Sequence, residues 1–303
     1  MTTTNNTGSQ VKITKNFIDI EKVFSEKNPK LAGLIPGFVF SYLKRVIHQD
    51  EINETIYTNR DKFGIEFLNE ILDRFGVEVI TEGMENVPPT GRYLLASNHP
   101  LGGLDGMALM REIGKIRRDF LFPVNDLLMN LPNLKELFIP INKHGSNADN
   151  IRIFNETFAS DHLLLYFPAG LVSRKQNGKI VDLEWKKTFL SKAIRYKRDI
   201  IPVFIDGRNS NFFYNLSNLR KKLGLKANIE MLYLVDEMYK QKDKTIKIIF
   251  GRPIPFTLFD KRHTYGEWAT ILKQYVYAMG TDKDIDFNDF LTRIETNEQT
   301  SKG

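Results

Sequence analysis

From Val77 onward, short runs of apolar, β-branched and aromatic residues alternate with longer amphipathic segments, and this alternation limits the possible folds more than any other feature. The runs are 77–80 (VEVI), 93–96 (YLLA), 120–124 (FLFPV), 137–141 (LFIPI), 163–167 (LLLYF), 200–205 (IIPVFI) and 245–250 (TIKIIF). They are apolar on both faces and about 15 to 40 residues apart, which is typical of strands in a helix-covered sheet. The segments expected to be helical are 104–116, 147–157, 183–197 and 264–279. The sequence therefore predicts an α/β fold.

The segment before Val77 has a different pattern, with few strand signals. Residues 16–75 show helical periodicity, which ends in EFLNEILDRF before Gly76. The chain start, MTTTNNTGSQ, has neither a basic n-region nor an apolar h-region, so we expect no secretory signal. We expect four parts: a disordered tip (1–15), a helical section (16–76), the main domain (77–280) and a mobile polar tail (281–303).

Composition excludes several classes of protein. Of 303 residues, 42% are hydrophobic, which suffices for a sizeable core and excludes a disordered chain. The absence of cysteine excludes disulfides, thiolate nucleophiles and Cys-ligated zinc. A net charge of +6 favours an anionic partner such as a nucleic acid, a phosphorylated ligand or a membrane surface.

Residues 31–43 (LAGLIPGFVFSYL) form the longest weakly polar stretch. Its thirteen residues are interrupted by Pro36, whereas a membrane-spanning helix needs about 20. Its flanks are basic, so it suits the membrane interface, and an equally good interpretation is a helix packed on the domain. On the first interpretation the membrane-contacting residues include Leu34, Phe38, Lys44 and Arg45. The segment 211–226 (NFFYNLSNLRKKLGLK) allows the same two interpretations.

The first motif with chemical potential is SNHPLGGLDG, at 97–106, directly after an expected strand. Sites in α/β sheets gather at such strand ends. His99 can act as a general base near neutral pH, and a carboxylate on its other ring nitrogen would orient it and raise its basicity. Gly102 and Gly103 allow a tight turn that could bring Asp105 back to the ring. The spacing alone is equally compatible with an ordinary loop histidine.

The second motif is YFPAGLVSRK, at 166–175, where a strand is followed by Pro, Gly and a basic pair. Backbone N–H groups in such a turn, together with Arg174 and Lys175, can hold a phosphate. In isolation these residues are also typical of a solvated turn. A third segment, IPVFIDG at 201–207, reads as a buried strand.

The order of these motifs resembles the glycerolipid acyltransferase family, the lysophosphatidic acid acyltransferase group, whose blocks are NHxxxxD, a central strand with a basic residue, FPEGTRS and a VPV strand. The resemblance covers roughly 77–255. It implies a mixed sheet, a general base at His99 and an orienting acid at Asp105. The reaction it implies is attack of a hydroxyl on the thioester of acyl-CoA or acyl-carrier protein, with no resident cofactor and no metal.

The resemblance also implies an acceptor site. The positions that match the family's acceptor-binding block are Gly170, Ser173 and Arg174, with Gly102 and Gly103 in the first turn and Lys143, or alternatively Arg152, after the central strand. His144 and Asp149 have the family's four-residue spacing, but His144 lies only 24 residues before Pro168, too few for the elements between the two motifs.

Two departures from the family pattern point to a particular branch. Five residues, PLGGL, separate His99 from Asp105, and Ala169 stands where the family has Glu. HPLGGLDG with FPAG is more similar to enzymes that O-acylate lyso-aminolipids in ornithine and glycine lipid synthesis, whose acceptor carries a carboxylate and no phosphate. We expect a cytoplasmic enzyme, peripheral on the inner face of the cell membrane, that takes its lysolipid from the bilayer.

Two alternatives stay open at this point. One is an enzyme that acylates 1-acylglycerol 3-phosphate. The other is a non-catalytic module that binds anionic lipid or nucleic acid. We expect no nucleic-acid partner, because the basic residues are scattered and no RNA or DNA motif is visible.

Overall fold

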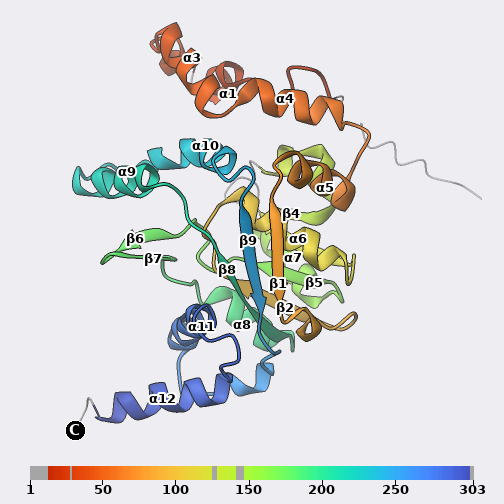
Figure 1. The fold of residues 1–303 in the computed structure, drawn as a ribbon, viewed down its shortest axis with the longest axis vertical. Helices are drawn as coiled ribbons and strands as arrows, with labels where there is room; N and C mark the ends of the chain where they lie inside the picture. Colours follow the sequence, from red (N-terminus) through yellow and green to blue (C-terminus); the bar gives the residue numbers. More distant parts are fainter. Residues whose placement is uncertain (1–12, 28, 125–127, 141–146, 301–303) are drawn as a thin grey trace, which may run out of the picture.

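A seven-stranded mixed sheet forms the centre of the molecule (Figure 1). The computed structural model describes residues 13–27, 29–124, 128–140 and 147–300. The strand order is β1-β9-β8-β2-β5-β3-β4. The strands are β1 (Glu78–Glu82), β2 (Tyr93–Ser97), β3 (Phe120–Val124), β4 (Phe138–Pro140), β5 (Leu163–Tyr166), β8 (Asp199–Asp206) and β9 (Thr245–Phe250). Neighbours are parallel except β8 and β9, which pair antiparallel. The expected mixed sheet is confirmed.

Helices cover both faces of the sheet because the central strands are apolar on both. In β2 the side chain of Leu95 enters one core and that of Leu94 the other, since successive residues of a strand point to opposite faces. The first core is shared with helices α5 (Gly64–Arg74) and α6 (Gly103–Gly114). The second is shared with helices α7 (Asn147–Ala159), α8 (Thr188–Arg195) and α11 (Tyr265–Met279).

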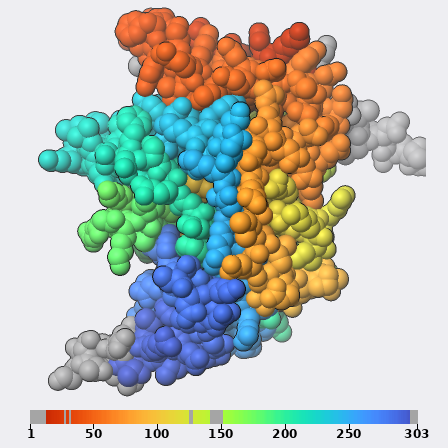
Figure 2. Space-filling view, in the orientation of Figure 1, coloured from red at the N-terminus to blue at the C-terminus, as the bar shows by residue number. Residues whose placement is uncertain are grey.

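The N-terminal section is helical, as expected, and packs over α10 (Leu234–Tyr239), as Figures 1 and 2 show. Its helices are α1 (Ile20–Lys27), α2 (Pro29–Ala32), α3 (Gly37–Val46), α4 (Gln49–Thr58) and, at its end, α5. His48 stacks on Tyr239 with ring centroids 3.8 Å apart, and its Nε2 lies 3.3 Å from a carboxylate oxygen of Asp236. These contacts fix the section to the main domain.

A two-stranded hairpin begins within the second motif, at Arg174, and was not predicted from the sequence. It consists of β6 (Arg174–Gln176) and β7 (Lys179–Val181), joined by Asn177 and Gly178, both with positive φ. Asn-Gly with two left-handed residues is the turn that two-residue hairpins favour. Beyond β8 comes helix α9 (Asn211–Lys222), whose Ser210 caps it by accepting from the backbone N–H of Phe213.

The segment expected to be a mobile polar tail instead forms helix α12 (Phe287–Thr300). Phe287 and Leu291 are buried, and Phe290 and Ile294 pack beside them against the second core. These four positions lie on one helical face, so the apolar residues are few but correctly spaced for a docked helix.

Short 3₁₀ helices complete the described chain: η1 (Met84–Asn86), η2 (Leu128–Asn130), η3 (Pro132–Leu137), η4 (Ile229–Tyr233) and η5 (Phe256–Leu258).

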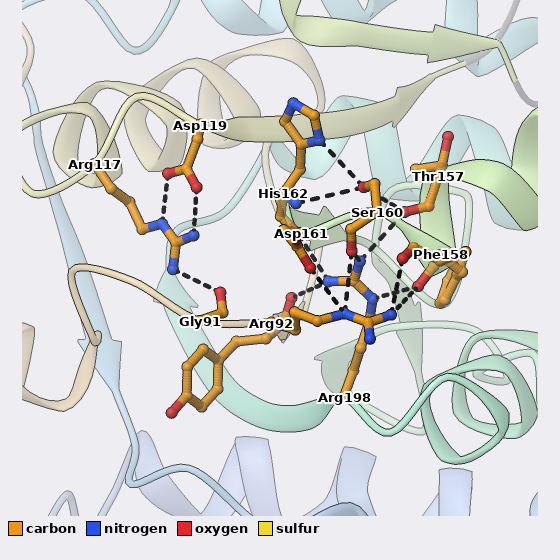
Figure 3. Close-up of polar contacts among 12 residues, drawn as sticks. Gly91, Arg92, Arg117, Asp119, Thr157, Phe158, Ser160, Asp161, His162 and Arg198 are labelled. Atoms are coloured by element: carbon orange, nitrogen blue, oxygen red, sulfur yellow. Dashed lines mark hydrogen bonds and ion pairs between the residues drawn. The ribbon is translucent and has the colours of Figure 1, made fainter.

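A fully buried arginine joins α7, β2 and β8 at the edge away from the motifs (Figure 3). The guanidinium of Arg198 donates to the carbonyl oxygens of five residues, Tyr93, Thr157, Phe158, Ser160 and His162. Two of these carbonyls, those of Thr157 and Phe158, belong to the last turn of α7, where helical carbonyls lack intrahelical partners. Burial first, and then the charge of Arg92, lowers the pKa of Arg198 to about 10.

Candidate active site

The first two motifs meet because β2 and β5 are parallel neighbours in the sheet. Ala96 pairs with Tyr166, so the loops that leave both strands start side by side. His99 follows β2, Phe167 follows β5, and their rings stack with centroids 4.1 Å apart and planes 18° apart. Residues almost 70 positions apart in the chain therefore form one site.

The ring of His99 contacts the carboxylate of Asp105, as the sequence predicted. Its Nδ1 lies 3.0 Å from Oδ1 and 3.1 Å from Oδ2. Asp105 is fully buried, whereas the side chain of His99 is 17% exposed, so the ring can reach a ligand and the acid cannot. The extra residue between the two does not prevent the contact.

Backbone donors hold the Asp105 carboxylate in place. Oδ2 accepts from the N–H of Leu101 at 2.8 Å, and Oδ1 accepts from the N–H of Gly106 at 2.8 Å. Asp105 lies in the first turn of α6, where the helix dipole also favours a negative charge.

Burial and charge act in opposite directions on His99. Burial lowers the pKa of the ring, but the charge of Asp105 and its hydrogen bond raise it, with a further increase from Asp182, so that the net pKa lies above the usual value. The raised pKa makes the ring a stronger base.

The two glycines of the first motif have different functions. Gly102 is buried and adopts φ 82° and ψ −127°, a conformation that only glycine takes readily, and it directly precedes α6. Gly103 is exposed, begins α6 and has open space where a Cβ would stand. Gly102 alone therefore makes the turn that brings Asp105 to the ring.

An exposed cation that the sequence did not single out lies beside the second loop. Gly170 is exposed with φ 64°, and Nζ of Lys186 lies 3.3 Å from the position a Cβ on Gly170 would occupy. The backbone N–H of Lys186 donates to the carbonyl of Pro168, which fixes its place beside the loop. A flexible ammonium thus lies above the turn that begins with Phe167.

The structure corrects the expectation that Ser173 and Arg174 are open to a ligand. Both are only 1% exposed. Ser173 donates to Asp182 at 2.5 Å, and the guanidinium of Arg174 pairs with the buried carboxylate of Glu230 at 3.0 Å and lies over the ring of Phe213. The family block FPEGTRS has its arginine two residues after glycine, and that position here is Val172, which is buried. Arg174 lies in β6 with its side chain turned inward.

Asp182 is a second residue of the site, after Lys186, that the sequence did not single out. It is fully buried just after β7, and its carboxylate accepts hydrogen bonds from the backbone of His99 at 3.2 Å and from the Trp185 indole at 2.9 Å. These partners belong to segments far apart in the chain, and nothing in DLEW indicates such a role.

Other predicted positions lie outside the site or outside the described residues. Lys143 and His144 fall among residues that the structure does not describe. Arg152, the alternative to Lys143, is on α7 and pairs with Glu156 at 3.0 Å with both side chains well exposed. Within the described ranges, no three His, Asp or Glu side chains are grouped as metal ligands would be.

The predicted membrane-contacting residues have mixed surroundings. Leu34 is 79% exposed and Phe38 is 76% exposed, whereas Phe40 of the same helix is buried. Lys44 pairs with Glu21 at 2.7 Å, and the guanidinium of Arg45 lies 5.7 Å from the ring of Tyr42. No helix in the described part of the chain is both long enough and apolar enough to cross a bilayer.

Comparisons with known proteins give a consistent result. Residues 22–285 match the model of a family described as "Acyltransferase". A lyso-glycine lipid O-acyltransferase of Bacteroides thetaiotaomicron is 49% identical over 265 residues, which are 87% of this chain and 97% of that protein. A protein of the same description from Phocaeicola vulgatus is 48% identical over 265 residues, covering 87% of this chain and 95% of its own.

Among solved structures, the chain is similar to the 1-acyl-sn-glycerophosphate (LPA) acyltransferase of Thermotoga maritima. That match has a TM-score of 0.45 and 15% identity, and it covers 79% of this chain and 95% of the other.

Proposed function

Because the chain belongs to the acyltransferase family, we propose that it transfers a fatty acyl group from a thioester to the hydroxyl of a lysolipid, and that this lysolipid is a lyso-aminolipid of the glycine or ornithine type. The observation that carries the proposal is the His99–Asp105 pair, in which a buried acid holds an accessible ring. The two relatives described as lyso-glycine lipid O-acyltransferases support the choice of acceptor.

The pair acts as a general base with an orienting acid. Nδ1–H of His99 donates to the Asp105 carboxylate, so the lone pair is on Nε2. Nε2 takes the proton of the acceptor hydroxyl as that oxygen attacks the thioester carbonyl and forms a tetrahedral intermediate. The intermediate collapses to an ester, the C–S bond breaks, and the leaving thiolate takes the proton from the imidazolium. Proton transfer of this kind contributes roughly 10² to 10⁴ in rate.

We assign the carboxylate of the acceptor to Lys186. Its ammonium is exposed above the Gly170 turn, whereas the guanidinium of Arg174 is occupied by Glu230. Lysine binds a carboxylate or a phosphate as a compact point charge. The choice of an aminolipid over 1-acylglycerol 3-phosphate is therefore supported by the two relatives rather than by this cation.

The acyl donor in this reaction is acyl-CoA or acyl-carrier protein. Activation is supplied by the thioester itself, so the chemistry needs neither a metal nor a resident cofactor. The ring of Phe167, stacked on His99, provides an apolar wall next to the reacting hydroxyl.

We further propose that the enzyme is cytoplasmic and attaches to the inner face of the cell membrane. Leu34 and Phe38 are exposed on the N-terminal section, and Phe212, Leu219 and Leu223 are exposed on and after α9. Lys221 and Lys222 are exposed beside them and suit anionic headgroups.

Acyl transfer by the purified protein tests the proposal. A 3-hydroxyacyl-glycine and 1-acylglycerol 3-phosphate are offered separately with acyl-CoA and with acyl-carrier protein, and products are identified by mass spectrometry. We expect the aminolipid to be acylated and His99→Ala to lose at least about 10² of the rate. The control is His162→Ala, because the imidazole of His162 is exposed and its Nδ1 bonds to the hydroxyl of Ser160, a neighbour in the chain.

Each alternative has its own outcome in this assay. Preference for 1-acylglycerol 3-phosphate would favour the phosphatidate-forming enzyme. Binding to anionic vesicles without product from either acceptor would favour a non-catalytic lipid-binding module.

A further inference from the structure

Asp182 connects both loops of the active site although its carboxylate does not touch the reacting ring. Oδ1 accepts from the backbone N–H of His99 at 3.2 Å and from the hydroxyl of Ser173 at 2.5 Å. Oδ2 accepts from Nε1 of Trp185 at 2.9 Å. Both oxygens are therefore bonded, and their donors come from the loop after β2, the start of the β6–β7 hairpin and the approach to α8.

The backbone of Asp182 is also fixed, from the side of α11. Its N–H donates to the hydroxyl of Tyr277 at 2.8 Å, and Nζ of Lys273 donates to its carbonyl oxygen at 2.6 Å and to that of Leu183 at 3.1 Å. A second link joins the two loops directly, because the N–H of Ser173 donates to the carbonyl of His99 at 2.8 Å.

Burying the carboxylate of Asp182 costs folding free energy, so its presence points to a role beyond packing. Asp182 is 0% exposed, and its carboxylate accepts hydrogen bonds from neutral donors. The ammonium of Lys273, bonded to the Asp182 carbonyl, acts on that carboxylate through its charge. An uncharged acceptor could satisfy most of the same donors, so hydrogen bonding alone does not require the charge.

We propose that Asp182 is a positioning residue of the acyltransferase: it holds the backbone of His99 against the second loop, and its charge stabilises the imidazolium that forms when the ring takes the proton. This inference rests on the proposed function. Asp182 is then a second carboxylate beside the His99–Asp105 pair. It acts on His99 through the hydrogen bond to the backbone N–H and through its negative charge.

The charges around His99 agree with this assignment. The ring is faced by Asp105 from α6, by Asp182 after β7 and by Arg174 from β6. Asp105 and Asp182 raise the pKa of His99, whereas burial and Arg174 lower it. Asp182 in turn is faced by Lys273 and Tyr277 of α11, and burial lowers the pKa of Lys273 while Asp182 and Glu184 raise it.

The test compares Asp182→Asn with Trp185→Phe. The asparagine keeps the shape and removes the charge, whereas the phenylalanine keeps the charge and removes one of its donors. We expect Asp182→Asn to reduce kcat on the order of 10²-fold, as displacement of a catalytic group does. The KM for acyl donor should stay within about twofold, and the acidic limb of kcat/KM should move to lower pH. Trp185→Phe should leave the limb at its wild-type pH.

A titration of the histidine rings by NMR tests the role of Asp182 separately from the proposed acyl transfer, because it needs no turnover. His99 is assigned by loss of its signal in His99→Gln, and its pKa should be lower in Asp182→Asn than in wild type. If the wild-type protein is active, and Asp182→Asn has the wild-type kcat and the wild-type pKa of His99, the role of Asp182 is overturned. A wild-type protein that acylates neither acceptor would overturn the proposed function instead.

If Asp182→Asn does not fold, Ser173→Ala tests the link between the loops. It removes the 2.5 Å bond and keeps the charge. We expect kcat to fall about tenfold, the lower end of the loss seen when a group that orients a functional residue is removed. Unchanged kcat in this variant would overturn the positioning role.

Discussion

Replacing each glycine of the first motif by alanine tests the geometry that brings Asp105 to His99. Gly102 adopts φ 82° and ψ −127°, and its added Cβ would lie 3.4 Å from a methyl of Leu234, an ordinary contact. The expected cost is therefore conformational, about 1 to 3 kcal/mol for a non-glycine residue in such a region. Gly103 has open space at that position and begins α6, so alanine there should gain a few tenths of a kcal/mol up to about 1.

The two variants should differ in both stability and activity. Urea unfolding should give a lower midpoint for Gly102→Ala and an equal or higher one for Gly103→Ala, with unchanged slopes. If the strain relaxes by moving the turn, the carboxylate leaves His99 and kcat for acyl transfer falls in Gly102→Ala alone. Equal midpoints and equal kcat for the two variants would refute the assignment of the turn to Gly102.

Three other changes have defined outcomes. Asp105→Asn should lower kcat by about 10² to 10⁴-fold. It should also move the acidic limb of kcat/KM to lower pH, because the Asp105 charge raises the pKa of His99. A limb that stays in place or moves to higher pH would show that the Asp105 charge does not raise this pKa. Lys186→Ala should raise the KM for the aminolipid by about tenfold, equivalent to roughly 1.4 kcal/mol, with Lys186→Arg restoring it; an unchanged KM would exclude the carboxylate contact. Arg198→Met should destabilise the fold by about 3 kcal/mol in urea unfolding, because buried carbonyls lose their donor; a loss below about 1 kcal/mol would show that water replaces it.

The strands of the sheet could be predicted from the sequence because the central ones, β2, β5 and β8, are almost wholly buried and apolar on both faces, and the others also carry short runs of apolar residues. Runs such as 120–124 and 245–250 match β3 and β9 at both ends. The β6–β7 hairpin has strands of three residues, RKQ and KIV, which are too short and too polar to give that signal. Its one local signal is the Asn177–Gly178 turn, which was overlooked.

The C-terminal helix was missed for a different reason. Overall polarity dominates a composition-based interpretation of residues 281–303, whereas docking requires only a narrow apolar stripe. Phe287 and Leu291 supply that stripe by packing on the second core.

At the site, local residues were predictable and long-range partners were not. His99 and Asp105 are joined by one turn, so the glycines between them allow the contact, and the family resemblance rather than the spacing alone predicts it. Asp182 meets His99 only because the hairpin folds back to the end of β2, and no local pattern encodes that contact. A basic residue near a glycine turn predicts contact with a ligand, and for Arg174 this prediction is wrong. The hairpin directs its guanidinium to Glu230 instead.

The charges at the site limit how an acceptor can lie. Two carboxylates, Asp105 and Asp182, raise the pKa of His99, and the cation Arg174, which lowers it, shares its charge with Glu230. The imidazolium is favoured in these surroundings, and by the same reasoning an anionic head group next to the ring is disfavoured. An anionic acceptor that presents its hydroxyl to His99 must therefore keep its charged end away from the ring. The exposed ammonium of Lys186, above the Gly170 turn, provides a favourable place for that end. A hydroxyl carried on an acyl chain, separated from the carboxylate by several bonds, satisfies both requirements, whereas a phosphate close to the reacting hydroxyl brings its charge toward the two acids.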